Sequence, residues 1–298
     1  MPSLINSSPE PADDTSDGLS LLVERARAGD GKALNLLVAK LVDDVYHLSL
    51  RMTASPADAE DATQEVMIKV VTHLGTFRGD ASVRTWAYRI AVRHLVDQRK
   101  TRVEALGLDF DGFAADLLDG LESQGQAEDP LAAAEVKLGC TLAMLTCLDR
   151  EHRVAYILGE VFDFHSSLAA TIADVSDQVY RQRLSRARRQ LEAFTKSYCG
   201  VVNPSAPCHC DRRVKRAAEL GRLERSNLRL VSHPTIGIIK KVREMEALHS
   251  TAALFRSHPD YAAPSHIAKR VKELFSTGAL ELLQDGHGRS PHGKASSD

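Results

Sequence analysis

Apolar residues recur at helical spacing along most of the chain and predict a series of amphipathic helices. One helical face in the first part of the chain carries Leu34, Leu37, Leu41, Val45, Leu48 and Met52. A second helix begins at Pro56, where a missing N–H is harmless in the first turn. Its inward positions are Ala59, Ala62, Val66, Val70 and Leu74. A third helix runs from about Ser82 to Lys100, with core positions at Val83, Trp86, Ile90 and Ala91.

The stretch 176–191, SDQVYRQRLSRARRQL, predicts a helix with one apolar and one cationic face. Its apolar positions are Tyr180, Leu184, Ala187 and Leu191. Ser176 suits the N-cap, and Asp177 suits the positive end of the helix dipole. The preceding segment SSLAATIADVS predicts a short helix and a tight turn, an order typical of a helix-turn-helix that enters the DNA major groove. The alternative is a solvated arginine face on an ordinary bundle helix.

These patterns divide the chain into five segments. Residues 1–18 are polar and typical of a disordered N-terminus, while 19–101 and 131–197 read as two small helical domains. Residues 102–130 form an acidic connector that we expect to be a flexible linker. Residues 198–298 form a mostly helical C-terminal extension that begins with a Cys-rich loop. The 298 residues are 43% hydrophobic and only 5% aromatic, which fits the all-α fold that the patterns predict.

Charge is segregated along the chain although the formal net charge is only −2. Residues 104–129 hold eight acidic residues and no Lys or Arg, whereas bases gather in 78–102, 181–189 and 212–225. A role in DNA binding must therefore rest on local patches. No run approaches the roughly twenty apolar residues of a membrane span, and no signal sequence begins the chain. Five cysteines argue against a secreted disulfide framework, so we expect a cytoplasmic protein that does not bind membranes.

Two stretches in this order resemble bacterial sigma factors. Residues 58–100, DAEDATQEVMIKVVTHLGTFRGDASVRTWAYRIAVRHLVDQRK, are similar to their second conserved domain. Residues 148–191, LDREHRVAYILGEVFDFHSSLAATIADVSDQVYRQRLSRARRQL, are similar to their fourth. A variable linker and no third domain are typical of the extracytoplasmic-function (ECF) group of the sigma-70 superfamily, and the resemblance covers about 20–197. It implies a non-enzymatic protein that binds core RNA polymerase, through its β′ and β subunits, and promoter DNA, both duplex and melted.

The resemblance assigns candidate residues to three surfaces. It implies polymerase binding, on a coiled coil of the β′ subunit, for Asp58, Asp61, Gln64 and Glu65. It implies that the melted minus-ten element is recognised by Phe77, Arg78, Tyr88, Arg89 and Arg93. It implies that the minus-thirty-five duplex is recognised by Asp177, Gln178, Arg181, Gln182, Arg183, Arg186, Arg188 and Arg189.

Residue chemistry agrees with these surfaces. Aromatic rings and guanidinium groups can hold unstacked bases, and we interpret Trp86 as a core residue rather than a base platform. Gln178, Arg181 and Gln182 lie where a recognition helix reaches base edges, and the later arginines suit phosphate.

A solubilising face is the alternative for the acidic stripe at 58–65. Arg93 stands where the family commonly carries Asn. Asp174 stands where Gly is usual, and Asp tolerates the left-handed turn that we expect there.

The linker and the extension leave several alternatives open. In the family the linker is thought to follow the path of nascent RNA; an ordinary tether is equally compatible. Cys199, Cys208 and Cys210 could bind zinc, form a redox-sensitive disulfide or be inert. We expect Cys140 and Cys147 to be packing residues.

Two other classes of protein compete with a sigma factor. A free-standing helix-turn-helix regulator would bind promoter DNA without polymerase, and a zinc- or thiol-responsive regulator would depend on the cysteines. The sequence names no anti-sigma partner, although one is possible. No nucleophile elbow, P-loop or dinucleotide fingerprint indicates an enzyme.

Overall fold

The computed structural model describes residues 16–119, 129–231 and 249–276, and these are helical apart from turns and one isolated β-bridge. Of the predicted disordered N-terminus, residues 1–15 lie outside the described residues, as do residues 277–298 at the other end of the sequence. The prediction is wrong for residues 16–18, because they form the start of a helix. The N-terminal module comprises α1 (Ser16–Arg27), α2 (Gly31–Thr53), α3 (Pro56–Thr72), the short η2 (Leu74–Thr76) and α4 (Val83–Asp97). The C-terminal module comprises α6 (Pro130–Leu145), α7 (Arg150–Tyr156), η4 (Ile157–Val161), α8 (Ser166–Ala173) and α9 (Asp177–Tyr198).

Side-chain caps begin three of these helices where the sequence predicts a start. Ser55 caps α3 ahead of Pro56, Ser82 caps α4, and Ser176 caps α9. The predicted face of α2 is buried apart from Leu34, which is half-buried. The tight turn before α9 is confirmed, since Asp174 has φ 55° and ψ 44°.

The predicted linker contains ordered structure, namely η3 (Glu104–Leu106) and α5 (Phe110–Leu118). Asp109 caps α5 by accepting the N–H of Gly112. Phe113 is buried, with its ring centroid 5.7 Å from that of Phe194 on α9. Residues 102–119 pack rather than forming a free tether, because this acidic stretch includes a capped helix with one apolar side. Residues 120–128 of the predicted linker lie outside the described residues.

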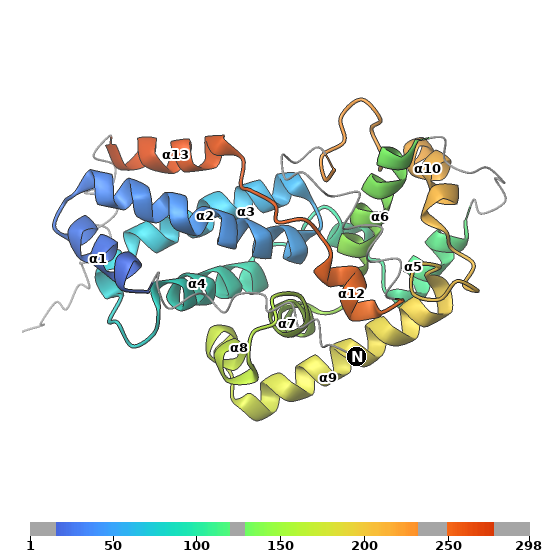
Figure 1. Ribbon diagram of the computed structural model, residues 1–298, viewed down its shortest axis with the longest axis horizontal. Helices are drawn as coiled ribbons and strands as arrows, with labels where there is room; N and C mark the ends of the chain where they lie inside the picture. The colour runs from blue at the N-terminus through green and yellow to red at the C-terminus, as the bar shows by residue number, and fades with distance from the viewer. Residues whose placement is uncertain (1–15, 120–128, 232–248, 277–298) are drawn as a thin grey trace, which may run out of the picture.

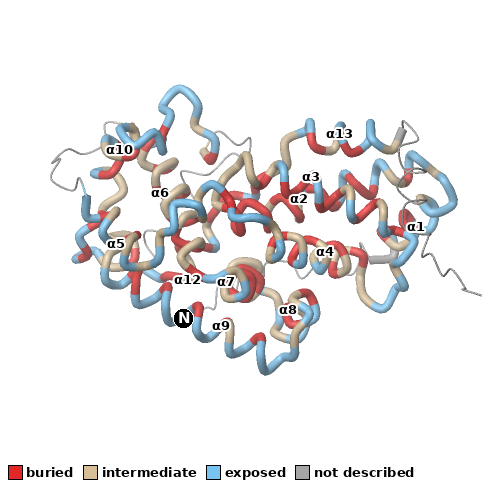
Figure 2. Tube along the Cα trace, turned by 180° about the vertical axis from the view of Figure 1, so that it is seen from behind, coloured by how far each residue is buried: buried red, intermediate tan, exposed pale blue. Residues whose placement is uncertain are grey.

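The two modules pack together instead of standing apart (Figure 1). Helix α4 lies against α8, and α2 lies against α6 and α7. One hydrophobic core runs through both modules, and its buried residues are visible along α2, α3 and α7 in Figure 2.

The extension contributes α10 (Cys210–Glu219), α12 (Thr251–Arg256) and α13 (Ser265–Ser276). Helix α10 packs on α6, α12 on α9 and η4, and α13 on α2 and α3 (Figure 1). The helical pattern predicted at about 235–256 lies partly outside the described residues, and the pattern at 264–283 is present as α13 as far as it is described. The described extension therefore touches both modules.

Candidate polymerase and promoter interfaces

Helix α9 presents the cationic face that the sequence predicts. Tyr180, Leu184, Ala187 and Leu191 are buried against the C-terminal module. The opposite side forms a shallow open groove of about 460 Å³. The groove is lined by Gln178, Arg181, Gln182, Ser185, Arg186 and Arg189. Ser185 is absent from the sequence-based candidates, although its spacing from Arg181, Gln182 and Arg189 places it on the same face. Asp177 is also exposed, in the first turn.

Two of the predicted phosphate contacts bind carboxylates of the chain itself. Arg183 Nη2 lies 2.5 Å from Glu151 Oε2. Arg188 Nε lies 2.5 Å from Glu160 Oε1. These arginines lie on the flanks of α9, beside α7 and η4, so the groove cations are Arg181, Arg186 and Arg189.

A second groove, of about 630 Å³, lies between α3 and α4 on the N-terminal module. Its walls are Lys69, His73, Thr76, Trp86, Ile90, Arg93, His94, Asp97, Gln98 and Arg99. Trp86 and Ile90 pack against the hydrophobic core as predicted, but both are only half-buried, and their open sides line this groove. The fully buried side of α4 is formed by Val83, Thr85, Ala87, Ala91, Val92 and Leu95.

The aromatic and basic residues of this groove have defined supports. The rings of Trp86 and Phe77 have centroids 5.5 Å apart. Arg27 holds the turn that carries Phe77, since it donates to the carbonyls of Leu74 (2.9 Å) and Gly75 (3.2 Å). Burial and the charge of Lys69 lower the pKa of His94. Arg78 is exposed on the adjoining loop.

Tyr88 and Arg89, two of the predicted minus-ten residues, face the C-terminal module instead of the groove. The Tyr88 ring lies 5.6 Å from that of Phe164 in an edge-on contact, and 6.1 Å from that of Phe162. Burial raises the pKa of Tyr88 well above its usual range. Arg89 Nη2 lies 3.2 Å from Asp174 Oδ1 in the turn before α9.

The acidic stripe on α3 is partly open. Asp61 and Glu65 are exposed, and Glu65 Oε2 lies 3.5 Å from His94 Nε2. Gln64 is half-buried. Asp58 accepts the backbone N–H of Arg102 at 2.9 Å, so the start of the linker occupies this carboxylate.

The cysteine-rich loop folds back on the end of α9. Cys199 and Cys208 form a parallel β-bridge, in which Gly200 N–H donates to the Cys208 carbonyl at 2.8 Å. A Cβ at Gly200 would lie 2.7 Å from that carbonyl, so glycine permits the close approach. No disulfide joins any of the five cysteines, and Cys140 and Cys147 are half-buried. Burial raises the pKa of Cys208 to about 11.

Neither a metal centre nor a membrane span is found in the part of the chain that the structure describes. There, no three His, Cys, Asp or Glu side chains are grouped so that they could hold a metal ion, and Cys199, Cys208 and Cys210 are included in that search. None of the described helices combines the length and apolar character needed to span a bilayer.

Comparison with known proteins finds one family model and several relatives. The family described as Sigma-70 region 2 matches residues 37–103. The RNA polymerase sigma-H factor of Pseudomonas aeruginosa is 30% identical over 177 residues, which cover 57% of this chain and 90% of the relative. The ECF RNA polymerase sigma-E factor of Escherichia coli K12 is 32% identical over 178 residues, which cover 58% of this chain and 91% of the relative.

Among solved structures, the chain is similar to CnrH in its complex with the cytosolic domain of CnrY. The identity is 21% and the TM-score 0.43, over 59% of this chain and 96% of that one. The family is decided by the sequence identity to the two sigma factors, because the matched stretches cover almost the whole length of each. The chain belongs to the extracytoplasmic-function group of the sigma-70 family of RNA polymerase sigma factors.

Proposed function

We propose that this sigma factor reads a promoter with two separate surfaces, the α9 groove and the α3–α4 groove, while α3 contacts core RNA polymerase. The observation that supports this division is that each module carries its own basic groove, and only the groove of the N-terminal module includes an aromatic ring. Duplex DNA presents phosphates and base edges, whereas melted DNA also presents unstacked base faces. The two grooves suit these two forms of DNA.

The α9 groove is proposed to bind the minus-thirty-five duplex. Gln178, Arg181 and Gln182 lie in the first two turns, the part of a recognition helix that reaches base edges. Arginine pairs with guanine and glutamine with adenine in the major groove. Arg186 and Arg189 lie further along the same face and suit phosphate contacts.

The α3–α4 groove is proposed to hold the melted minus-ten strand. Trp86 offers a half-exposed ring braced by Phe77, and Lys69, Arg93 and Arg99 supply cations along the groove. A base stacked on an aromatic side chain contributes about 1–3 kcal/mol, and this term depends little on sequence. Selectivity at minus ten would then come from the polar wall of the groove.

The exposed carboxylates of α3, Asp61 and Glu65, are proposed to contact polymerase. Charge complementarity across such a contact mainly sets the association rate and the register. None of these roles involves covalent chemistry, which agrees with a transcription-initiation factor rather than an enzyme.

Run-off transcription with purified core polymerase on a pool of random promoters tests this function. We expect the full chain to select a defined promoter class with core enzyme and to bind it weakly alone.

Arg181→Ala should relax selection at one base pair, at a cost of about 1–3 kcal/mol. Arg186→Ala/Arg189→Ala should weaken all promoters alike and reduce the slope of log affinity against log salt by about 2. Lys40→Ala, exposed on α2, serves as the control. Tight promoter binding without core, and no defined start site with it, would contradict the proposal.

A further inference from the structure

The packing of the two modules conflicts with simultaneous reading of both promoter elements. By their names these elements lie about 25 base pairs apart, or roughly 85 Å of duplex at ~3.4 Å per pair. A compact body of about 200 residues has a radius of gyration of about 17 Å and spans about 40 Å. In addition, α4 is covered on its Tyr88 side by Phe162 and Phe164. The modules must therefore separate before both grooves can be occupied.

The part of the C-terminal extension that contains α12 and α13 crosses the junction between the modules. This part is called the strap below. On the C-terminal module, Thr251 Oγ1 of α12 lies 2.7 Å from Thr195 Oγ1 of α9. The ring of Phe255 meets that of Tyr156 edge-on at 5.3 Å. Arg256 Nη2 lies 3.0 Å from Asp163 Oδ1. These contacts fix the start of the strap to the module that carries the α9 groove.

The strap then passes from α6 of the C-terminal module to α2 of the N-terminal module. His258 is buried, with Nε2 2.6 Å from Thr141 Oγ1 of α6 and Nδ1 3.0 Å from the Tyr261 hydroxyl. The Tyr261 ring lies 5.8 Å from the Arg51 guanidinium of α2, and the Ala263 N–H donates to Asp43 at 2.7 Å. Helix α13 continues along α2 and α3.

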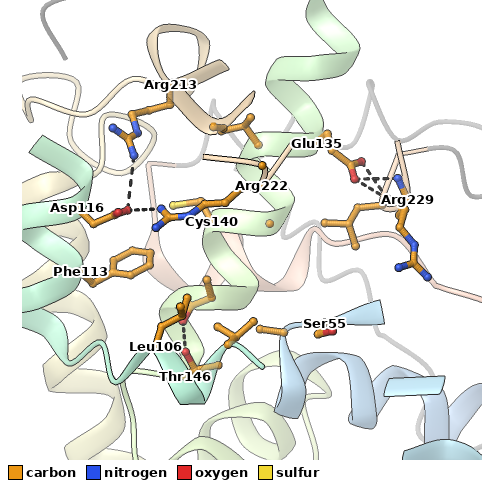
Figure 3. A pocket seen from close by; sticks show the side chains of 18 of the residues that line it. Ser55, Leu106, Phe113, Asp116, Glu135, Cys140, Thr146, Arg213, Arg222 and Arg229 are labelled. Atoms are coloured by element: carbon orange, nitrogen blue, oxygen red, sulfur yellow. Dashed lines mark hydrogen bonds and ion pairs between the residues drawn. The ribbon is translucent and has the colours of Figure 1, made fainter. Parts of the chain in front are cut away.

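A second part of the extension holds the acidic linker. Arg216 of α10 contacts Asp119 through Nε at 3.0 Å and Nη2 at 2.5 Å. Arg222 Nη1 lies 2.6 Å from Asp116 Oδ2, and Arg213 Nη2 lies 3.6 Å from the same oxygen. Figure 3 shows Asp116 between the Arg213 and Arg222 side chains. Three arginines of the extension thus neutralise two carboxylates of the linker.

The exposure of these ion pairs decides whether the contact is reversible. The side chains of Arg216 and Asp119 are 31% and 54% exposed, and those of Arg222 and Asp116 are 41% and 17% exposed. These two pairs contribute little individually and weaken with salt, so a competing charged surface can displace them. The Arg213 side chain is 6% exposed and forms the buried part of the contact. By contrast, the strap residues Tyr261 and His258 are buried.

We propose that the C-terminal extension is an intramolecular clamp, in which the arginine face of α10 binds the acidic linker and the strap holds the two promoter-reading modules together. Release of Asp116 and Asp119 from Arg213, Arg216 and Arg222 frees the linker, and only then do the modules separate on polymerase and DNA. This proposal depends on the proposed function, because closure matters only if both grooves must bind DNA at once.

A charge-swap experiment on the full chain tests the clamp. Non-canonical amino acids at Lys40 and Gln190, both exposed, carry dyes that report the separation of the modules by energy transfer. We compare Arg216→Glu, the swap Asp119→Arg/Arg216→Glu, and Lys215→Glu, an exposed control on α10 with the same change in charge. Affinity for core polymerase is measured on the same labelled proteins.

We expect Arg216→Glu to lower the energy transfer and to raise the affinity for core polymerase about fivefold, since a larger fraction of the chain is open. Lys215→Glu should leave both values unchanged. The swap should restore the energy transfer of the wild type, and this readout does not depend on what the linker does in polymerase.

Two results would overturn the clamp: Arg216→Glu behaves like Lys215→Glu, or the swap leaves the modules as far apart as Arg216→Glu does. If promoter-directed transcription is normal in either case, the proposed function stands and only the clamp fails. If the energy transfer changes as expected but no variant initiates transcription with core polymerase, the proposed function fails, and the inhibitory role of the clamp fails with it.

Discussion

Replacing Glu104 with glutamine removes a charge at the centre of the junction between the modules. Glu104 lies in the linker, with Oε2 2.6 Å from Arg150 Nη2 and Oε1 2.9 Å from Arg153 Nη1. The Arg153 side chain is 2% exposed and that of Glu104 9%. Arg153 also donates to backbone carbonyls of its own module, and it reaches the carbonyl of Met52 in the N-terminal module. Glu104 therefore compensates a buried cation that bridges the modules.

The structure gives the size of this effect in two ways. Burial would raise the pKa of Glu104, but hydrogen bonds from Arg150 and the Thr101 N–H, with the charge of Arg153, lower the pKa from 4.5 to about 2. A lowering of the pKa by that amount corresponds to about 3 kcal/mol of stability at neutral pH. Removing one partner of a buried ion pair costs about 3–5 kcal/mol, and glutamine keeps the shape of the side chain. We expect Glu104→Gln to lower the free energy of unfolding by about 3 kcal/mol.

Urea unfolding of the full chain measures this loss. Glu192→Gln is the control, because that carboxylate is half-exposed and pairs with Lys196 four residues further along the same helix. The pH dependence has a definite sign, since a carboxyl with a lowered pKa stabilises the fold only when it is ionised. The contribution of Glu104 is complete above pH 4.5 and is lost as the pH falls toward about 2. A loss no larger than that of Glu192→Gln, or one equal at pH 7 and pH 3, would refute the reasoning.

The remaining predictions concern packing and DNA. Gly159→Ala should lower the free energy of unfolding by about 1–3 kcal/mol, because its Cβ would lie 2.6 Å from the Tyr180 hydroxyl; thermal unfolding measures the loss. Gly139→Ala is the matched control, since its Cβ would lie 3.8 Å from the nearest side chain. A helical alanine at this position should stabilise α6 by up to ~1 kcal/mol. Equal melting temperatures of the two variants would contradict both expectations. Trp86→Ala should weaken binding of the holoenzyme to a pre-melted promoter by about 1–3 kcal/mol and leave binding of the minus-thirty-five duplex unchanged, as measured by fluorescence anisotropy; equal losses on the two DNAs would exclude a stacking role.

Features that depend on local sequence could be predicted. The buried stripe of α9 and its Ser176 cap follow from helical spacing and from the chemistry of one hydroxyl. The left-handed turn at Asp174 was implied by the resemblance, since the family usually carries Gly there, and Asp tolerates positive φ. Each of these involves residues within a few positions of one another.

Features that depend on distant contacts could not be predicted. Arg216 and Asp119 are separated by 97 residues, and Arg89 and Asp174 by 85. No periodicity indicates which module Tyr88 faces, because both sides of α4 carry aromatic residues. The apolar character of Trp86 predicts its packing against the core, but it does not indicate that α3 leaves an open groove beside the ring.

Cleavage of promoter DNA by a tethered iron chelate tests the account most directly. Chelates on non-canonical residues at Ser185 in the α9 groove and at Thr76 in the α3–α4 groove would be assembled with core polymerase on a selected promoter. The account predicts two separate cleavage sites about 25 base pairs apart, in duplex DNA from Ser185 and in the melted strand from Thr76. Cleavage of one shared region by both probes, or the same pattern without core polymerase, would contradict it.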